Sequence, residues 1–137
     1  MPVECRLDAE AGIVYTVVSG EIGASDIIEA VEELFRNPDF RPGLIGLADL
    51  RSYTWRSEMS DIRRVAQFMI ANGSKIGRSR TAIVVASDYS YGMSRMYEAF
   101  AAASPIKVKI FRDMDEAVAW LRDDRRGGEE DPDGGDR

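Results

Sequence analysis

Histidine is absent from this chain of 137 residues, and cysteine occurs once, at Cys5. Without an imidazole, the sequence excludes Ser–His–Asp and Cys–His catalysis, and it excludes zinc held by histidine. A single thiol can form neither an internal disulfide nor a thiolate metal site, which suits a reducing compartment. Any acid–base chemistry would depend on carboxylates, tyrosines or lysines. We therefore predict no metal site and no cofactor.

Long hydrophobic runs are also missing. No apolar stretch reaches the length that a transmembrane helix requires, and the first residues lack the apolar region of a signal peptide. We therefore expect a cytoplasmic protein. The net charge is −6 and the bases form no stripe, which argues against nonspecific binding of nucleic acid. Neither glycine-rich phosphate-binding motif occurs.

What the sequence does contain is a regular alternation of strand and helix patterns. Five segments are apolar or alternate as strands do, at 3–8, 13–18, 44–48, 81–86 and 106–111. Helical patterns follow a cap at Ser25, cover 57–72 up to a stop at Gly73, include 93–100, and begin at Asp113. This order predicts an α/β fold: a five-stranded mixed sheet, formed by an N-terminal hairpin and then parallel β-α units, with about four helices.

The character of each strand predicts its place in the sheet. The first and fifth strands alternate, and the fifth exposes Lys107 and Lys109, as protected edge strands do. The middle three are apolar on both sides, as interior strands are. We therefore expect the strands in chain order, with the first antiparallel to the second and the crossover helices on one face. The second face needs another cover: the final helix, the loop with Tyr53 and Trp55, a partner subunit or an apolar ligand.

Composition divides the chain near its end. Residues 1–121 contain all the predicted strands and helices and are expected to form one domain. Residues 122–137 are rich in glycine and charge and have no large apolar side chain. Such a segment cannot offset the entropy lost on ordering, so we expect a disordered tail.

Three segments carry a family resemblance: LADLRSYT after the third strand, RTAIVVASDYSYGMSRMYEAF, and IKVKIFRDMDEAVAWL. The pattern resembles the STAS domain of bacterial anti-sigma-factor antagonists. It is more similar to the SpoIIAA-like group of small bacterial proteins, described as STAS/SEC14-like. The resemblance covers the chain from Val3 to Leu121 in element order. It implies a mixed sheet with helices and no known enzyme activity.

The resemblance also directs attention to one serine. Anti-sigma antagonists carry a phosphorylatable serine in a D-S-S-G-like run at a helix start after the third strand. Here that region reads RSEMSDI, without the glycine or the paired serines. Ser57 is the nearest candidate for phosphorylation and Ser60 the next. The hydroxyl of Ser57 could equally act as a helix cap.

Polar side chains follow the predicted parallel strands, at the edge where ligands of open α/β sheets bind. We expect a ligand-binding set there, in which the tyrosines supply aromatic walls and the arginine an anion contact: Asp49, Arg51, Ser87, Tyr89 and Tyr91. A purely structural interpretation is available as well. In it Asp88 and Asp113 cap helices, Arg51 pairs with Asp49, and Tyr91 covers the core.

Three functions are compatible with these patterns. The first is a non-catalytic regulatory or protein-interaction module that acts as a homodimer or with a regulatory partner. The second is a carrier or sensor that binds a small apolar or anionic ligand, in a groove walled by methionines and aromatics. The third is an enzyme that uses Asp49 or Asp88 with Tyr89 or Tyr91. We do not expect an enzyme, because nothing in the sequence brings a nucleophile, a base and an oxyanion site together.

Overall fold

The computed structural model describes residues 3–54 and 59–123. Its strands and helices follow the order expected for an α/β chain, with one short 3₁₀ segment at Ala101–Ala103. The strands are β1 (Val3–Asp8), β2 (Ile13–Gly20), β3 (Ile45–Tyr53), β4 (Ser79–Val84) and β5 (Ile106–Phe111). The helices are α1 (Ala24–Phe35), α2 (Met59–Ala71), the single-turn α3 (Gly73–Ile76), α4 (Asp88–Phe100) and α5 (Met114–Arg122).

The five strands form one mixed sheet in the order β1-β2-β3-β4-β5. β1 pairs antiparallel with β2, and every later pair is parallel. The predicted fold class and strand order are therefore confirmed. β5, which carries Lys107 and Lys109, is an edge strand as expected. The three strands that are apolar on both sides, β2, β3 and β4, each lie between two partners, as expected.

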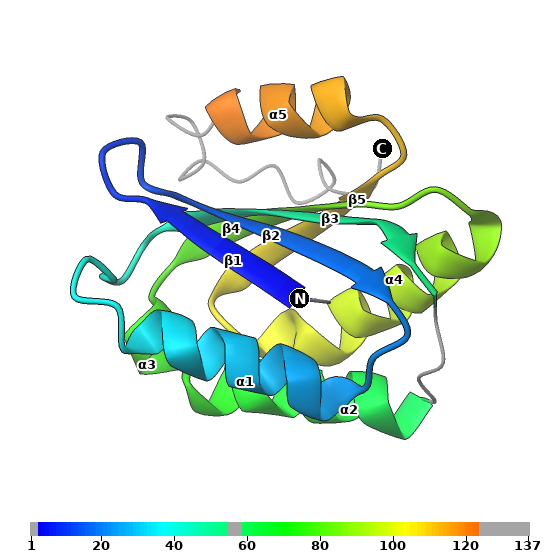
Figure 1. The fold of residues 1–137 in the computed structure, drawn as a ribbon, viewed down its shortest axis with the longest axis horizontal. Coiled ribbons are helices and arrows are strands. Elements are labelled where there is room, and N and C mark those ends of the chain that lie inside the picture. Colours follow the sequence, from blue (N-terminus) through cyan, green and yellow to red (C-terminus); the bar gives the residue numbers. More distant parts are fainter. Residues whose placement is uncertain (1–2, 55–58, 124–137) are drawn as a thin grey trace.

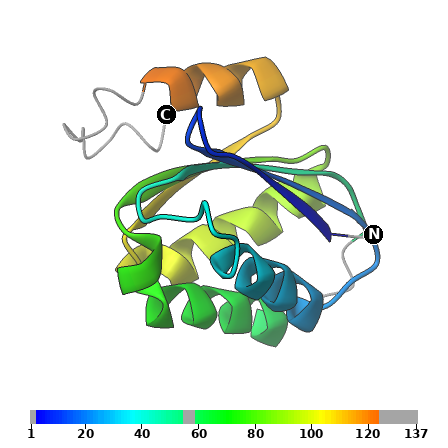
Figure 2. The same ribbon diagram turned by 60° about the vertical axis from the view of Figure 1, so that its left-hand side comes forward.

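Helices cover both faces of the sheet (Figure 1). Helices α1, α2 and α4 form a layer on one side, and α5 lies alone on the other. Figure 2 shows the same separation after rotation. α5 packs against β3, β4 and β5, so the final helix is the part of this chain that covers the second face. Tyr53 does not contribute there: it ends β3 and is buried with Val18 and Ile22, while Trp55 lies outside the described residues.

Several predicted boundaries are wrong. β3 does not end at residue 48 but runs to Tyr53, because its parallel pairing with β2 resumes after an irregularity between Val17 and Ser19. β4 covers Ser79–Val84 rather than 81–86. Gly73 does not stop the helical segment but begins α3.

The helix caps also differ in part from prediction. Gly23, not Ser25, caps α1, and its backbone N–H donates to Asp26 Oδ2 at 3.2 Å. Ser87 rather than Asp88 caps α4. Asp113 caps α5 as expected, by accepting a bond from the Asp115 N–H at 3.0 Å.

The turn after α3 fastens one end of the helical layer to the loop before β3. Gly77 has φ +73°, and a Cβ there would lie 2.8 Å from the Cβ of Pro42. Glycine is the residue that tolerates both the positive φ and this contact. Beside it, the Gly43 N–H donates to the Ile76 carbonyl at 2.8 Å. In the same loop Leu44 is buried, and the Phe40 ring packs on Phe35 of α1.

Candidate functional site: an apolar cavity between sheet and helices

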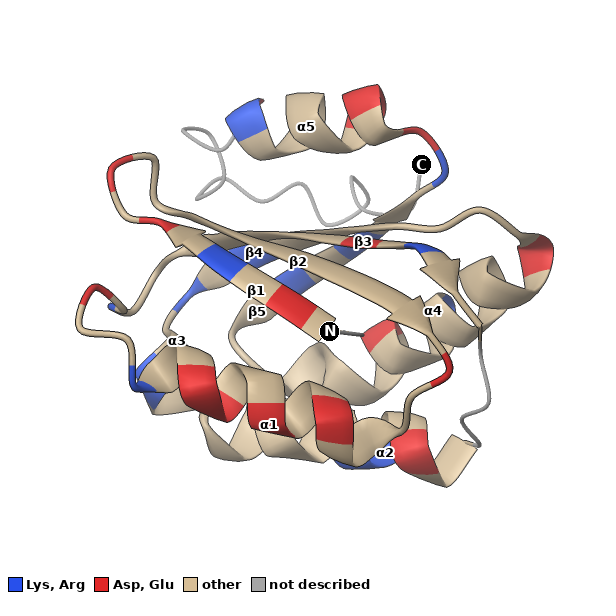
Figure 3. Ribbon diagram, in the orientation of Figure 1, with Lys and Arg blue, Asp and Glu red and all other residues tan. Residues whose placement is uncertain are grey.

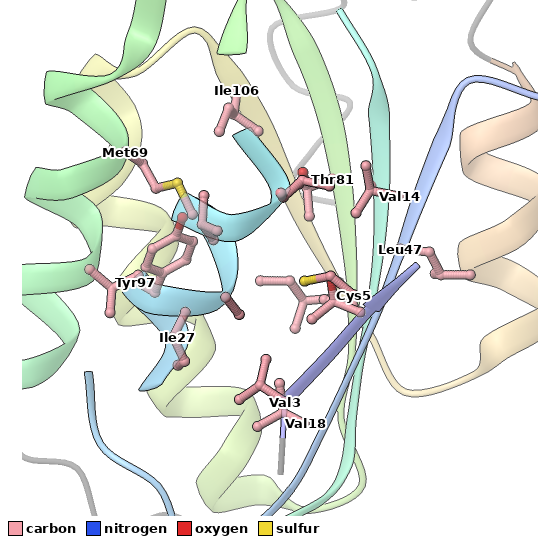
Figure 4. A pocket seen from close by; sticks show the side chains of 18 of the residues that line it. Val3, Cys5, Val14, Val18, Ile27, Leu47, Met69, Thr81, Tyr97 and Ile106 are labelled. Atoms are coloured by element: carbon pink, nitrogen blue, oxygen red, sulfur yellow. The ribbon is translucent and has the colours of Figure 1, made fainter. Parts of the chain in front are cut away.

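An apolar cavity of about 230 Å³ lies between the sheet and the layer of α1, α2 and α4. Figure 4 shows Ile27, Met69 and Tyr97 on its helical side and Cys5, Val14 and Thr81 on its strand side. An apolar cavity of about 150 Å³ is large enough to stay dry and bind benzene. The space is therefore sufficient for a small organic molecule.

The cavity exists because α1 does not pack down on the centre of the sheet. α1 contacts β1 and α2. Its apolar stripe includes Ile27, Val31 and Leu34, yet Ala24 is its one buried residue. An amphipathic helix normally buries that stripe against the sheet. Here much of the stripe borders open space instead.

Small side chains on the central strands enlarge this space from below. Gly46 and Ala48 of β3 line the cavity together with Thr81 of β4. A Cβ on Gly46 would lie 3.1 Å from Thr81 Oγ1, so glycine permits the close approach of the two strands here. Because these three residues are short, they fill less of the space beneath α1 than large side chains at the same positions would.

Aromatic rings secure one end of α1. The Phe35 ring meets the Phe40 ring edge-on at a centroid distance of 5.1 Å and stacks on Phe68 at 6.2 Å. The Lys75 ammonium lies 5.1 Å from the centroid of the same Phe35 ring. These contacts hold the C-terminal end of α1 over the sheet, so they help to keep the cavity open.

The strand side of the cavity contains two polar groups that bond to each other. Cys5 Sγ and Thr16 Oγ1 are 3.5 Å apart on β1 and β2. Burial raises the pKa of the Cys5 thiol above its usual value, an effect reduced by the Thr16 hydrogen bond and increased by Glu33. The thiol is therefore protonated at neutral pH and contributes to the wall as a small, weakly polar group.

Two residues of α4 that carry hydroxyls, Ser94 and Tyr97, line the helical side. Ser94 is 1% exposed, and its Oγ has no hydrogen-bond partner within the part of the chain that the structure describes. Tyr97 lies deep in the molecule but keeps accessible surface, because its side chain faces the cavity. Burial raises the pKa of Tyr97 to about 12. Its phenol therefore stays protonated at neutral pH.

Charge is sparse around the cavity. Among the described lining residues the one charged side chain is Asp61 of α2, which is half-buried. The charged positions of α1, shown in Figure 3, are all acidic: Asp26, Glu29, Glu32 and Glu33. The surroundings of the cavity are thus apolar inside and weakly negative outside.

The predicted ligand-binding residues lie elsewhere. Asp49 and Arg51 sit on β3 and form a two-pronged ion pair, with Arg51 Nε and Nη2 each 2.9 Å from a carboxylate oxygen. The hydrogen bond from Arg51 holds the pKa of Asp49 below its usual range, and the carboxylate raises the pKa of Arg51. This pairing matches the structural interpretation of the two residues.

Ser87, Tyr89 and Tyr91 lie together at the start of α4. The Ser87 hydroxyl caps the helix by accepting a bond from the Ser90 N–H at 3.0 Å. Tyr89 is 60% exposed. The Arg112 guanidinium lies 4.7 Å from the centroid of the Tyr91 ring and bonds to Asp88 at 2.7 Å. Ser87 and Tyr91 therefore take part in contacts within the protein, whereas Tyr89 is largely exposed.

None of the five predicted residues is among the described residues that line the cavity. Whether they bind a ligand is not tested by this structure, so that assignment stays a prediction. Ser57, the predicted phosphorylation site, lies outside the described residues. The sequence pattern placed Tyr97 on an apolar stripe and did not single out Ser94. A sequence signal for the cavity itself was available in the small residues Gly46 and Ala48.

The described residues hold no cluster of three or more acidic or cysteine side chains suited to a metal ion. Within the same residues, the helices are too short or too polar to cross a membrane.

Comparisons with known proteins identify the family. The SpoIIAA-like family model matches residues 13–122, which leaves β1 outside the match. No curated protein matches the chain. Among solved structures, the chain is similar to an uncharacterised protein of the DUF3478 family from Shewanella loihica PV-4, which has a SpoIIAA-like fold. That match has a TM-score of 0.58 at 16% identity and covers 87% of this chain and 91% of that one. The chain therefore belongs to the SpoIIAA-like family.

Proposed function

We propose that this protein is a carrier or sensor that binds a small apolar molecule in the cavity beneath α1. The supporting observation is the cavity itself, an opening of about 230 Å³ with a wall that is almost entirely apolar. Ligand sites of proteins are typically concave, apolar and provided with a few polar groups. If the cavity were empty, the side chains that line it would lose the van der Waals contacts that residues of a close-packed protein interior make.

The proposal is one of binding without catalysis. The carboxylate of Asp49 is held by Arg51, and Asp88 is paired with Arg112, so neither acts as an unengaged base. The Tyr97 phenol has a pKa of about 12 because of burial, which makes it a poor proton acceptor or donor for chemistry at neutral pH. We therefore expect a bound molecule to leave the protein chemically unchanged.

A cavity-filling substitution tests the proposal. Ala30 of α1 lines the cavity, and Ala30→Leu would place three additional carbon atoms in it. n-Butylbenzene should bind the unsubstituted protein with a heat measurable by calorimetry, and Ala30→Leu should weaken this binding at least tenfold. Ala99→Leu is the matched control, because Ala99 is exposed on α4 and its substitution should leave binding unchanged.

Native mass spectrometry provides a second measurement. Protein purified without denaturation should carry a small organic molecule that Ala30→Leu loses and Ala99→Leu keeps. Absence of binding by n-butylbenzene, or equal binding by all three proteins, would refute the cavity as a ligand site.

A second candidate function, protein interaction, is favoured by the sheet face beside α5. That helix covers β3, β4 and β5 but leaves part of β2 open, where Val17 is 44% exposed. The neighbouring Tyr15 is covered by the Arg6 guanidinium, 4.4 Å from its ring centroid. A second copy of the chain docking on this strip would bury Val17 and form a homodimer.

Light scattering distinguishes this candidate from ligand binding. A homodimer at tens of micromolar should become monomeric on Val17→Asp, whereas Ile70→Asp should remain dimeric. Ile70 is a fair control because it is an exposed aliphatic residue of α2, at 36% exposure. A monomeric unsubstituted protein at high concentration would rule out self-association.

A further inference from the structure

Two residues of α4 that carry hydroxyls, Ser94 and Tyr97, lie on the helical side of the largely apolar wall. Ser94 and Tyr97 are three residues apart on α4, a spacing that places them on one face of the helix. Both belong to the cavity lining. Ser94 Oγ has no partner among the described residues, and no hydrogen bond to the Tyr97 hydroxyl is found among them either.

Unpaired hydroxyls in a buried apolar wall are unfavourable, because each has given up its bonds to water without replacement. A serine in a helix commonly avoids this by bonding to the carbonyl four residues earlier. Ser94 does not make that bond within the described residues. The missing partner is therefore expected to come from whatever occupies the cavity.

The charges around the cavity restrict the chemistry of that occupant. No lysine or arginine lines the cavity within the part of the chain that the structure describes, and its one charged lining residue is the carboxylate of Asp61. The charged side chains of α1, which lies above the cavity, are all acidic. Lys75 lies near one end, on the Phe35 ring. A carboxylate ligand would enter a space with little to balance its charge, which strongly disfavours it.

We infer that the cavity selects a neutral apolar molecule bearing one hydrogen-bond acceptor oxygen, which receives bonds from the hydroxyls of Ser94 and Tyr97. A carbonyl oxygen fits because it has two lone pairs and can accept from two donors at once. The inference rests on the proposed function, since it specifies the ligand of the same cavity. The raised pKa of the Tyr97 phenol supports it, because the phenol remains a donor throughout the neutral range.

Three probes of similar size test this selection. Butyrophenone differs from n-butylbenzene by a carbonyl in place of one methylene, and 4-phenylbutyrate carries a charge. We expect butyrophenone to bind about tenfold more tightly than n-butylbenzene, as one or two added hydrogen bonds allow. We expect 4-phenylbutyrate to bind more weakly than either. Calorimetry at neutral pH gives all three dissociation constants.

The variant Ser94→Ala/Tyr97→Phe removes both hydroxyls and little else. Its affinity for n-butylbenzene should stay within a factor of about two, which also shows that the cavity still forms. Its affinity for butyrophenone should fall at least tenfold, to below that for n-butylbenzene, because the carbonyl is then buried without a partner. Ser74→Ala/Tyr15→Phe is the control, since neither residue lines the cavity, and it should retain the preference for the ketone.

The outcomes separate this inference from the proposed function. If n-butylbenzene binds and the ketone shows no advantage, or if the advantage survives in Ser94→Ala/Tyr97→Phe, the inference is wrong while the apolar site stands. Tighter binding of 4-phenylbutyrate would also overturn it, in favour of an anionic ligand. If no probe binds, both the inference and the proposed function fail.

Discussion

The two sides of the sheet are packed to different degrees. On the α5 side, Ala82, Val84, Phe111, Ala117 and Leu121 form a cluster of buried residues with at most 8% exposure each. The Arg80 guanidinium lies 4.1 Å from the Trp120 ring centroid and donates to the Trp120 carbonyl, which secures this helix further. On the other side, the large apolar residues of α1 remain half-buried above a cavity.

This difference suggests a division of roles. The short helix α5 buries Ala117 and Leu121 in a closed cluster and so contributes stability. The longer helix α1 buries Ala24 alone, which leaves room for a bound molecule. Local stability and binding capacity are often assigned to different parts of one fold, because a binding site must open and a core must not.

The largest expected difference comes from the same truncation on the two sides. Leu121→Ala should lower the free energy of unfolding by about 3 kcal/mol, because Leu121 is 3% exposed and its removal creates a new void. Leu34→Ala should cost about 1 kcal/mol, since Leu34 is half-buried and already borders open space. Urea unfolding measures both. Equal losses would show that α1 is packed as tightly as α5.

Enlarging an alanine should have opposite effects on the two sides. Ala117 of α5 is fully buried, at 0% exposure, so Ala117→Leu should overpack the core and cost about 2 kcal/mol. Ala30→Leu should instead stabilise the protein by about 1 kcal/mol, because its additional carbons fill existing space. Thermal or urea unfolding gives the sign of each change. Destabilisation by both would indicate that the space beneath α1 cannot accept more atoms.

Alkaline pH should weaken the cavity side through Tyr97. Its pKa is raised by burial from 10.0 to about 12, so the folded state keeps a proton that the unfolded state loses in this range. The free energy of unfolding should therefore fall by about 1.4 kcal/mol per pH unit between these two values. Tyr97→Phe should remove this contribution. Urea unfolding of both proteins at pH 9 and pH 11 checks it, and parallel losses would exclude Tyr97 as the cause.

The smallest effect is expected at Asp49. Asp49→Asn should change the free energy of unfolding at pH 7 by about 0.5 kcal/mol or less, because the ion pair with Arg51 is largely exposed. The lowered pKa of Asp49 means that its contribution is present above the unfolded-state value of 3.8 and is lost as pH falls through the folded value. Unfolding at pH 7 and pH 2.5 measures this. A loss of several kcal/mol would place Asp49 in a role beyond surface pairing.

The sheet was predictable because its signals are local. Alternation in the first and fifth strands, with Lys107 and Lys109 on the fifth, predicted two edges, and the structure confirms them. The length of β3 was not predictable, because Arg51 and Ser52 are polar and read as a loop. They extend the strand because β2 offers backbone partners beyond its irregularity, which is a property of the neighbour rather than of the segment.

The candidate site was less predictable. The pairing of Asp49 with Arg51 was one of the predicted alternatives, because residues two apart in a strand lie on the same face of the sheet. An apolar groove was among the predicted alternatives, but its position was not predictable, because its wall combines strand residues such as Cys5 and Thr81 with Ser94 and Tyr97 from a distant helix. A serine on a helix gives no sign in the sequence of whether its hydroxyl has a partner.

The sequence by itself determined the order of strands and helices, the two edges of the sheet, the identity of the family, and the absence of imidazole chemistry. The element order and the two edges follow from side-chain periodicity, the missing imidazole from composition, and the family from the resemblance that three segments carry. Periodicity acts over a few neighbouring residues. The tertiary structure alone decided that α5 covers the second face and that α1 stands above a cavity. A cavity is the space left between layers after they have packed, so its presence depends on the sizes of many side chains that are distant in the sequence.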